Sequence, residues 1–343
     1  MVFETYLPRY FCREYVEAKG NSMQLGMFMA VVLGIKPLMD DWIPQDKMDS
    51  FRKIFKQYGL KVRENIIFQQ INKEDIPREI LGKEYITTTS AKGYPLNFIP
   101  KPANRDLAHF TYVPAKQTTG VPLRREEVHV FISKEENLLK KGMWYPVVIK
   151  NRVIFQPKAD SLKYGYVLGY PDCCIKFFRK FNNWLIYSHL YEAYANTKGK
   201  PSFLCNPFLK DTSFSYIYHM PCSYSCGQTI SLARRLRVAI KKNEPDYVKI
   251  TDRYSRMPFL VFYEKKYYCF EGVMEGNQIR YNKFYFPSPE RSKNIYAEYL
   301  RNADTVKLEG KKLILTKKGK FIKELKPEYG SFAPEAPFLI QFS

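Results

Sequence analysis

The sequence contains no apolar run long enough to cross a lipid bilayer. The longest such run, MQLGMFMAVVLGI over residues 23–35, is shorter than the roughly 20 residues that a membrane-spanning helix needs. The N-terminal stretch MVFETYLPRYFCREYVEAK is charged and lacks the clean apolar segment and small-residue cleavage site of an export signal. These absences exclude the membrane-spanning class, and we expect a cytoplasmic protein with no membrane partner.

Several signatures of nucleotide-binding and catalytic proteins are also missing. The sequence has no glycine-rich phosphate loop, no dinucleotide-binding fingerprint and no pair of carboxylates at helical spacing. It also has no internal repeat. Any functional site must therefore be sought in other residues.

Acidic residues are few relative to basic ones. Asp and Glu number 34 against 55 Lys and Arg, which gives a formal net charge of +21. A thermophilic surface raises Lys and Glu together, so thermal adaptation does not account for this excess. Positive charge of this size favours polyanions, and we expect nucleic acid as the partner, with RNA as the first candidate. A basic surface without a specific partner is the alternative, and nothing in the sequence indicates the oligomeric state.

The cysteines indicate a site rather than a disulfide framework. Their number is odd and no export signal accompanies them, whereas disulfide frameworks belong mainly to exported proteins. Four of them gather in two short motifs, and clustered cysteines in a reducing compartment indicate metal binding or catalysis. The full set is Cys12, Cys173, Cys174, Cys205, Cys222, Cys226 and Cys269.

The pattern of apolar residues predicts an α+β fold. Alternating apolar residues in EEVHVFIS, residues 126–133, predict a strand, and residues 258–286 predict a meander of hairpins. Gly310 and Gly319 then mark turns between three further short strands. The predicted parts are an N-terminal mixed α/β region (1–160), a central helical module with the cysteine motifs (161–244) and a β-rich C-terminal region (245–343).

The stretch GYPDCCIKFFRKF predicts a helix that carries two cysteines in its first turn. Pro171 suits the first helical position because it has no N–H to leave unbonded. Asp172 suits the positive end of the helix dipole. Cys173 and Cys174 follow at the head of an apolar stripe, so we expect them to point into the protein.

A second stretch, HMPCSYSCGQTISLARRL, begins at His219 and predicts another helix start. Ser225 with Gln228 three residues later fits a capping box, which makes Cys226 the first helical residue and puts Cys222 in the entering turn. Free N–H groups and the dipole at a helix N-terminus stabilise a thiolate, which is the form that binds metal or attacks a substrate. Both motifs thus carry cysteines at chemically suitable positions.

Three chemistries compete for the constellation of Cys173, Cys174, His219, Cys222 and Cys226. Zinc would take Cys222, Cys226, His219 and one of the adjacent cysteines, because neighbouring side chains diverge by about 100° on a helix. An iron–sulfur cluster would use thiolates, up to all four, and is as well supported as zinc. A catalytic thiol would need a base, for which His219 is the candidate. Cysteines buried only for packing are the alternative without a site.

The motifs LGYPDCCIKFF and HMPCSYSCGQTISLA resemble those of a prokaryotic, largely archaeal family catalogued as domain of unknown function 483. The resemblance covers residues 165–245 and extends loosely into the flanks. It implies that the four cysteines and His219 form one unit. It implies no particular reaction.

Charge and cysteines together lead to three functional hypotheses. The first is a metal- or iron–sulfur-dependent enzyme that acts on RNA or another polyanion, with His219 as a ligand or as the catalytic acid–base group. The second is a non-catalytic nucleic-acid-binding module with a structural zinc site, which differs because a structural site has no open position. The third is a metal-free thiol enzyme. The sequence leaves open whether the protein is an enzyme.

Overall fold

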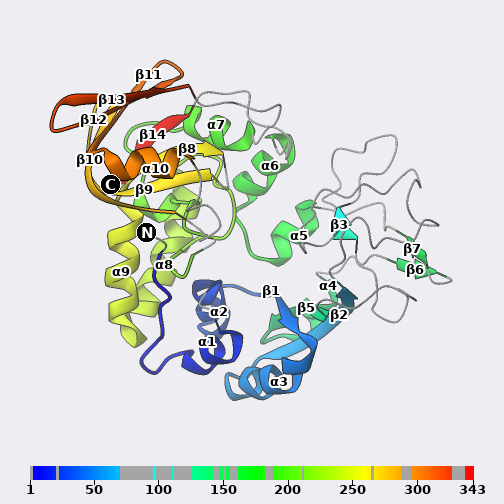
Figure 1. Ribbon diagram of the computed structural model, residues 1–343. Coiled ribbons are helices and arrows are strands. Elements are labelled where there is room, and N and C mark those ends of the chain that lie inside the picture. The colour runs from blue at the N-terminus through cyan, green and yellow to red at the C-terminus, as the bar shows by residue number, and fades with distance from the viewer. Residues whose placement is uncertain are drawn as a thin grey trace. The chain divides into compact units, whose positions relative to one another are not determined.

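A computed structural model describes most of the chain, and Figure 1 shows its elements. The described residues are 3–20, 23–69, 96–97, 110–111, 126–141, 147–149, 152–154, 161–181, 188–210, 212–263, 266–286, 295–326 and 337–343. The chain divides into two compact units, one made of Met1–Ala30 with Pro171–Ser343 and the other of Val31–Tyr170. The boundaries of these units differ from the predicted boundaries after residues 160 and 244. The division into three parts stays a prediction.

The unit Val31–Tyr170 contains a small antiparallel sheet and short helices. Its elements are β1 (Met39–Pro44), η1 (Gln45–Lys47), α3 (Met48–Gln57), β2 (Lys61–Gln69), β3 (Leu96–Asn97), β4 (Phe110–Thr111), β5 (Glu126–Ser133), α4 (Glu136–Lys141), β6 (Val147–Ile149), β7 (Arg152–Ile154) and α5 (Ser161–Val167). The strand order is β1-β5-β2, so the predicted strand β5 lies in the middle. Helix α3 buries Phe51, Ile54 and Phe55 on one face, as its amphipathic spacing requires.

A seven-stranded antiparallel sheet forms the C-terminal part of the other unit. Its elements are β8 (Pro258–Tyr263), β9 (Lys266–Glu275), β10 (Gln278–Tyr285), α10 (Ile295–Asn302), β11 (Thr305–Glu309), β12 (Lys312–Lys317), β13 (Lys320–Leu325) and β14 (Phe338–Gln341). The strand order is β13-β12-β11-β10-β9-β8-β14. Helix α10 packs its Ala297 and Leu300 into the core of this sheet. The predicted meander and the glycine turns are confirmed, since Gly310 and Gly319 have positive φ angles of 57° and 76°.

Helices make up the rest of this unit. They are α1 (Arg13–Lys19), α2 (Leu25–Val32, which reaches the unit boundary), α6 (Asp172–Phe181), α7 (Ser188–Ala195), η4 (Phe203–Cys205), α8 (Gly227–Asn243) and α9 (Pro245–Ser255). The predicted α+β class, with a helical cysteine-containing part and a β-rich C-terminal part, is confirmed. Helix α9 is an addition, because the sequence predicted a change to strands at Pro245. Within the described ranges, no helix combines the length and apolarity that a bilayer crossing requires.

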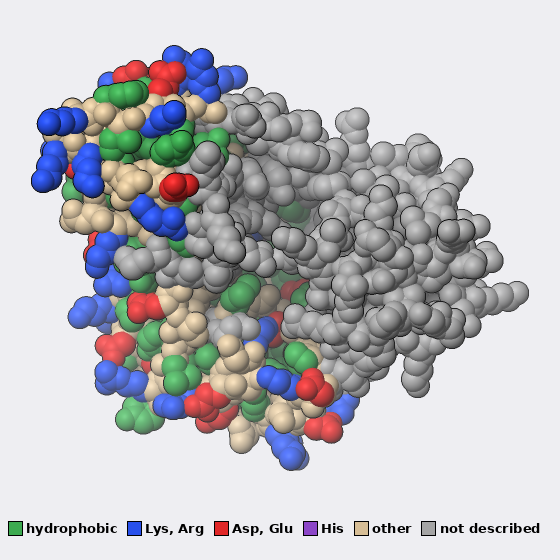
Figure 2. Space-filling model, viewed as in Figure 1, with side chains coloured by type: hydrophobic (Ala, Val, Ile, Leu, Met, Phe, Trp, Pro, Cys, Tyr) green, Lys and Arg blue, Asp and Glu red, His purple; other side chains and the backbone are tan. Residues whose placement is uncertain are grey.

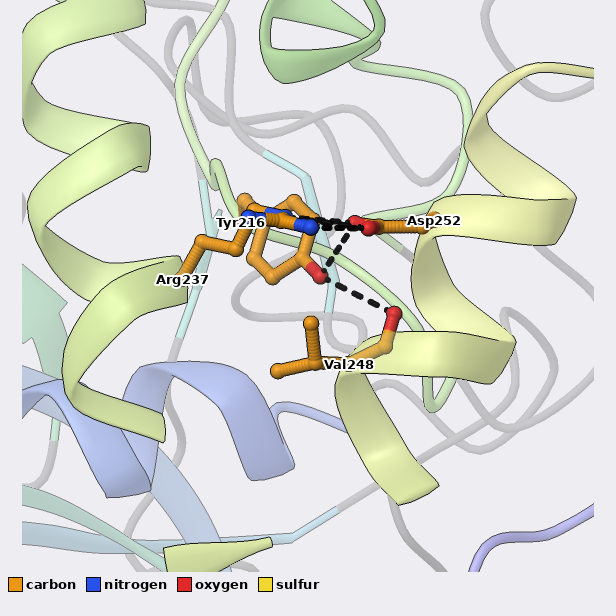
Figure 3. Close-up of polar contacts among 4 residues, drawn as sticks. All are labelled: Tyr216, Arg237, Val248 and Asp252. Carbon is orange, nitrogen blue, oxygen red and sulfur yellow. Dashed lines mark hydrogen bonds and ion pairs between the residues drawn. The ribbon is translucent and has the colours of Figure 1, made fainter. Parts of the chain in front are cut away.

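An ion pair joins α8 to α9 and fixes the segment that leads to His219 (Figure 3). Arg237 on α8 donates through Nε and Nη2 to the carboxylate of Asp252 on α9, at 2.5 to 3.0 Å. The Tyr216 hydroxyl donates to Asp252 Oδ1 at 2.8 Å and lies 3.3 Å from the Val248 carbonyl oxygen. A two-pronged arginine–carboxylate pair has a defined geometry, so the two helices and this segment are held in register.

A buried carboxylate between α8 and α9 explains why the N-terminal residues belong to this unit. Glu244 accepts hydrogen bonds from the Tyr6 hydroxyl at 2.8 Å and from the backbone N–H groups of Tyr10 and Phe11 at 3.0 Å each. A buried charge needs such partners to offset the loss of its water. The N-terminal segment is therefore attached to residues more than two hundred positions away, which local sequence patterns do not indicate.

A lysine is buried in the unit Val31–Tyr170. Lys36 is only 6% exposed, and its Nζ lies 4.0 Å from the ring centroid of Tyr170. Burial lowers the pKa of Lys36 to about 7, and the charge of Asp40 opposes this shift in part. Because a buried ammonium group loses its hydration, the folded state prefers the neutral amine.

We predict that this lysine makes the stability of the protein depend on pH. The unfolded chain keeps the Lys36 proton up to its ordinary pKa of 10.5, whereas the folded chain releases it near 7. The unfolded state thus binds more protons in this window, so the free energy of unfolding should rise with pH there. Denaturant titrations of the reduced protein across the window should show this rise, and Lys36→Met should diminish it. Equal pH slopes for both proteins would contradict the prediction.

Candidate metal centre

Four cysteine sulfurs from the two motifs converge on one point. The Sγ atoms of Cys173, Cys174, Cys222 and Cys226 all lie within 4.8 Å of one another. Cys226 Sγ is 3.6 Å from Cys173 Sγ and 3.7 Å from Cys174 Sγ, and these two are 3.8 Å apart. Among the described residues this group can hold a metal ion, because each sulfur offers one ligand atom at a shared centre.

Both adjacent cysteines take part in this group, although their expected divergence predicted a single zinc ligand from the pair. Each sulfur lies one bond beyond Cβ, so rotation about χ1 can swing both Sγ atoms of the first helical turn toward Cys226. The group is not uniformly enclosed. Cys174 and Cys226 are buried, whereas Cys173 and Cys222 are partly exposed.

The start of α6 matches the prediction closely. The helix begins at Asp172, and the carbonyl oxygen of Pro171 accepts the N–H groups of Cys174 and Ile175 at 3.0 Å each. Pro171 therefore lies just before the helix. The helix begins one residue later than predicted, a difference within the usual scatter of helix ends. Asp172 also pairs with Lys176 one turn later, at 2.9 Å.

The start of α8 differs from the predicted capping box. The helix begins at Gly227, and Cys226 is the N-cap residue, with an extended backbone and no side-chain cap hydrogen bond. Ser225 and Gln228 thus do not form a capping box. A Ser225 cap requires the helix to begin at Cys226, whereas it begins one residue later. Gln228 Oε1 instead accepts a hydrogen bond from Cys173 Sγ at 3.5 Å, which links the second motif to the first.

The electrostatics of the group favour a bound cation. Hydrogen bonds from Cys174 and Cys222 lower the pKa of Cys226, whereas bonding to Cys222 and Cys226, together with burial, raises the pKa of Cys174. Four thiolates this close would repel one another strongly, so the sulfurs alone share few negative charges. A bound dication would offset this repulsion and favour four thiolates, because thiols that coordinate a metal are deprotonated. The Cys222 backbone N–H, 3.4 Å from Cys174 Sγ, also supports a thiolate there.

A polar pair lies behind Cys174. Thr229 Oγ1 is 3.3 Å from Cys174 Sγ, and His219 Nε2 is 3.0 Å from the same hydroxyl oxygen. Both residues are buried. His219 is not one of the four residues whose ligand atoms converge, and it reaches the sulfurs through Thr229. Its predicted role as a ligand or catalytic acid–base group stays a prediction.

A fifth cysteine packs beneath the group without joining it. Cys205 is fully buried against Cys174 and Cys226. Its Sγ donates to the Cys226 carbonyl oxygen at 3.6 Å, and burial raises its pKa. Cys205 therefore supports the entry to α8. Cys12 and Cys269 are buried core residues.

Sequence reasoning missed Thr229, although a signal for it was present. The structure fully buries Thr229 on α8, together with Ala233 and Ile240. Thr229 and Ala233 are four residues apart and lie on the same helix face. A hydroxyl on a buried stripe, three residues after a cysteine, needs a polar partner, and that need points to the sulfurs.

We predict that Thr229 tunes the affinity of the group for metal. Thr229→Val keeps the side-chain shape but removes the hydroxyl between His219 and Cys174. Loss of such an outer hydrogen bond typically weakens metal binding by about 10–100-fold. Competition against a coloured chelator measures the affinity, and Thr229→Ser, which keeps the hydroxyl, is the matched control. Equal losses in both variants would show that the hydroxyl itself is unimportant.

Comparison with known proteins adds no functional assignment. No protein-family model, curated protein or solved structure matches this chain. The resemblance to domain of unknown function 483 therefore stays a prediction, and the proposals below rest on the chain's own geometry and charge.

Proposed function

We propose that the protein is a nucleic-acid-binding protein in which the four cysteines hold one structural zinc ion. The distances between the sulfurs carry the metal part of this proposal. Ligands about 2.3 Å from a tetrahedral centre stand about 3.8 Å apart, since a tetrahedron edge is about 1.6 times that radius. The distances of 3.6, 3.7 and 3.8 Å among Cys173, Cys174 and Cys226 agree with this value.

The same distances favour a single ion over an iron–sulfur cluster. In a four-iron cluster each cysteine binds a different iron atom, so the sulfurs must surround the whole cluster. They would then stand farther apart than ligands that share one ion. A spread of at most 4.8 Å suits a single tetrahedral zinc, with a single iron in the same geometry as the alternative.

The ligand set supports a structural role more than a catalytic one. Four protein thiolates fill a tetrahedral site, whereas catalytic zinc keeps one position open for water or substrate. His219 Nε2 bonds to the Thr229 hydroxyl, which in turn contacts Cys174 Sγ, and this link through Thr229 supports a positioning role for the imidazole more than the role of base in a thiol enzyme. The ion would join the starts of α6 and α8, which come from separate motifs.

Charge supports the nucleic-acid part of the proposal. The excess of 21 positive charges favours a polyanion, and phosphates of RNA are the first candidate. A structural zinc site gives a basic protein a rigid frame on which phosphate-binding side chains keep their places.

We predict one zinc ion per chain that depends on the four converging cysteines. Each of the substitutions C173S, C174S, C222S and C226S should lower the zinc content of protein purified without oxygen. Cys205→Ser is the matched control, because Cys205 is buried like Cys174 and Cys226 but lies outside the group, and it should keep the metal. Elemental analysis with a visible spectrum measures this. Iron together with sulfide would identify a cluster instead, and a metal-free protein would leave the thiol alternative.

We also predict that binding of RNA weakens with salt and with removal of the metal. Bound phosphates release counterions, so the logarithm of the affinity should fall linearly with the logarithm of salt concentration. Chelation should loosen the starts of α6 and α8 and lower the affinity, and added zinc should restore it. Anisotropy of a labelled RNA measures both effects. A salt-independent affinity would remove the polyanion from the proposal, whatever metal is found.

A further inference from the structure

A row of residues crosses the seven-stranded sheet on the face opposite α10. The strand register pairs Val273 with Arg280, Arg280 with Thr305, Thr305 with Thr316 and Thr316 with Phe321. Residues paired in this way project to the same side of a sheet. Both ends of the row are open to solvent, with Val273 57% and Phe321 65% exposed.

The other face of the same strands is the core. Val306 and Leu315 follow or precede members of the row in the chain and are buried in the cluster that includes Leu300 of α10. Successive side chains of a strand alternate between faces, so Thr305 and Thr316 point away from that core. Phe321 is thus exposed because its strand register places it on the face away from the core, and not because the strand end is frayed.

Lysines cluster at the tip of the hairpin between β12 and β13, next to Phe321 in the chain. Lys317 and Lys320 alternate with Thr316 and Phe321 and so project from the other face of the ribbon, and they can meet the same bound strand where it passes over the tip. Lys317 pairs with Lys320 across the hairpin, and Lys318 lies in the two-residue loop between them. Figure 2 shows Lys and Arg side chains gathered over the region of strands β11–β13, with acidic side chains among them. Within the described part of the chain these three lysines have no ion pair, whereas Lys312 at the far end of β12 pairs with Glu324 at 3.0 Å.

The loop residue Lys318 has an unusual backbone conformation. Its φ is 49° and that of Gly319 is 76°, which are the two positive angles that a two-residue hairpin loop of type I′ needs. Asparagine, aspartate or glycine fit the first of these positions better than lysine. The Asp304 carboxylate compensates by accepting the Lys318 backbone N–H at 2.7 Å. A lysine held at this position keeps a third positive charge at the hairpin tip.

We propose that this hairpin tip binds single-stranded RNA, with a base stacked on Phe321 and phosphates bound by Lys317, Lys318 and Lys320. Sites for single strands combine aromatic side chains with a basic surface, and stacking accepts any base. The proposal rests on the nucleic-acid binding proposed above and specifies where and how it takes place.

A rival basic surface lacks the aromatic component. The exposed side of α8 carries Arg234, Arg235, Lys241 and Lys242, and the helix contains no acidic residue. Its exposed large apolar residue is Val238, which offers no ring for stacking. This surface suits non-specific contact with phosphates, and it provides a control of equal charge.

The test compares two kinds of variant by anisotropy of a labelled single-stranded RNA over a range of salt concentrations. The triple variant K317Q/K318Q/K320Q should make the salt slope shallower by about 2, at about 0.7 for each lost phosphate contact. Phe321→Ala should weaken binding about tenfold with an unchanged slope, because stacking releases no counterions. Phe321→Tyr, which keeps a ring, should bind like the wild type.

The matched control is R234Q/R235Q/K241Q on α8, which removes the same charge and should change the slope by less than half as much. A loss in the α8 variant without one in the hairpin variant would overturn the proposal. So would an unchanged affinity in Phe321→Ala, or hairpin-dependent binding to phosphatidylserine vesicles without binding to RNA. If the wild type binds no RNA, the proposed nucleic-acid function itself fails. If the wild type binds RNA and the hairpin variants bind it equally well, only the proposed hairpin site fails.

Discussion

The repulsion that four converging thiolates would exert on one another is the constraint on which the cysteine group of this protein depends. The sulfurs of Cys173, Cys174, Cys222 and Cys226 lie within 4.8 Å of one another, and two helix starts must meet to bring them there. Backbone N–H groups and helix dipoles stabilise a thiolate, but they do not neutralise four. A metal ion bound there would resolve this conflict and would at the same time fasten α6 to α8, so that charge compensation and folding would become one event.

The surroundings of the sulfurs are arranged to keep that meeting point in place. Thr229 and His219 support Cys174 from behind, and Cys205 fills the space under Cys226. Farther along α8, the pair Arg237–Asp252 holds the helix to α9. Polar contacts therefore stabilise α8 at both its start and its middle, and they define where its basic outer side lies.

The distribution of charge, rather than its total, separates the surfaces of the protein. On much of the seven-stranded sheet, acidic partners offset the lysines, as in the pairs Lys307–Glu309 and Lys312–Glu324. At the hairpin tip, Lys317, Lys318 and Lys320 form no ion pair within the described part of the chain. An exposed ring close to such lysines contributes nothing to the core, and the proposed site for single-stranded RNA uses this combination.

The sequence by itself determined the features that depend on neighbouring residues. The helix start near Pro171, the strand at residues 126–133, the glycine turns and the position of both cysteine motifs at helix starts all follow from local spacing and backbone chemistry. Only the tertiary structure decided that Cys226 caps α8 in place of Ser225, that both adjacent cysteines join the group, and that Glu244 holds the N-terminal segment. It also decided which residues share a row with Phe321. These outcomes depend on long-range packing and strand register, in which a shift of one residue changes every contact while the local pattern stays the same.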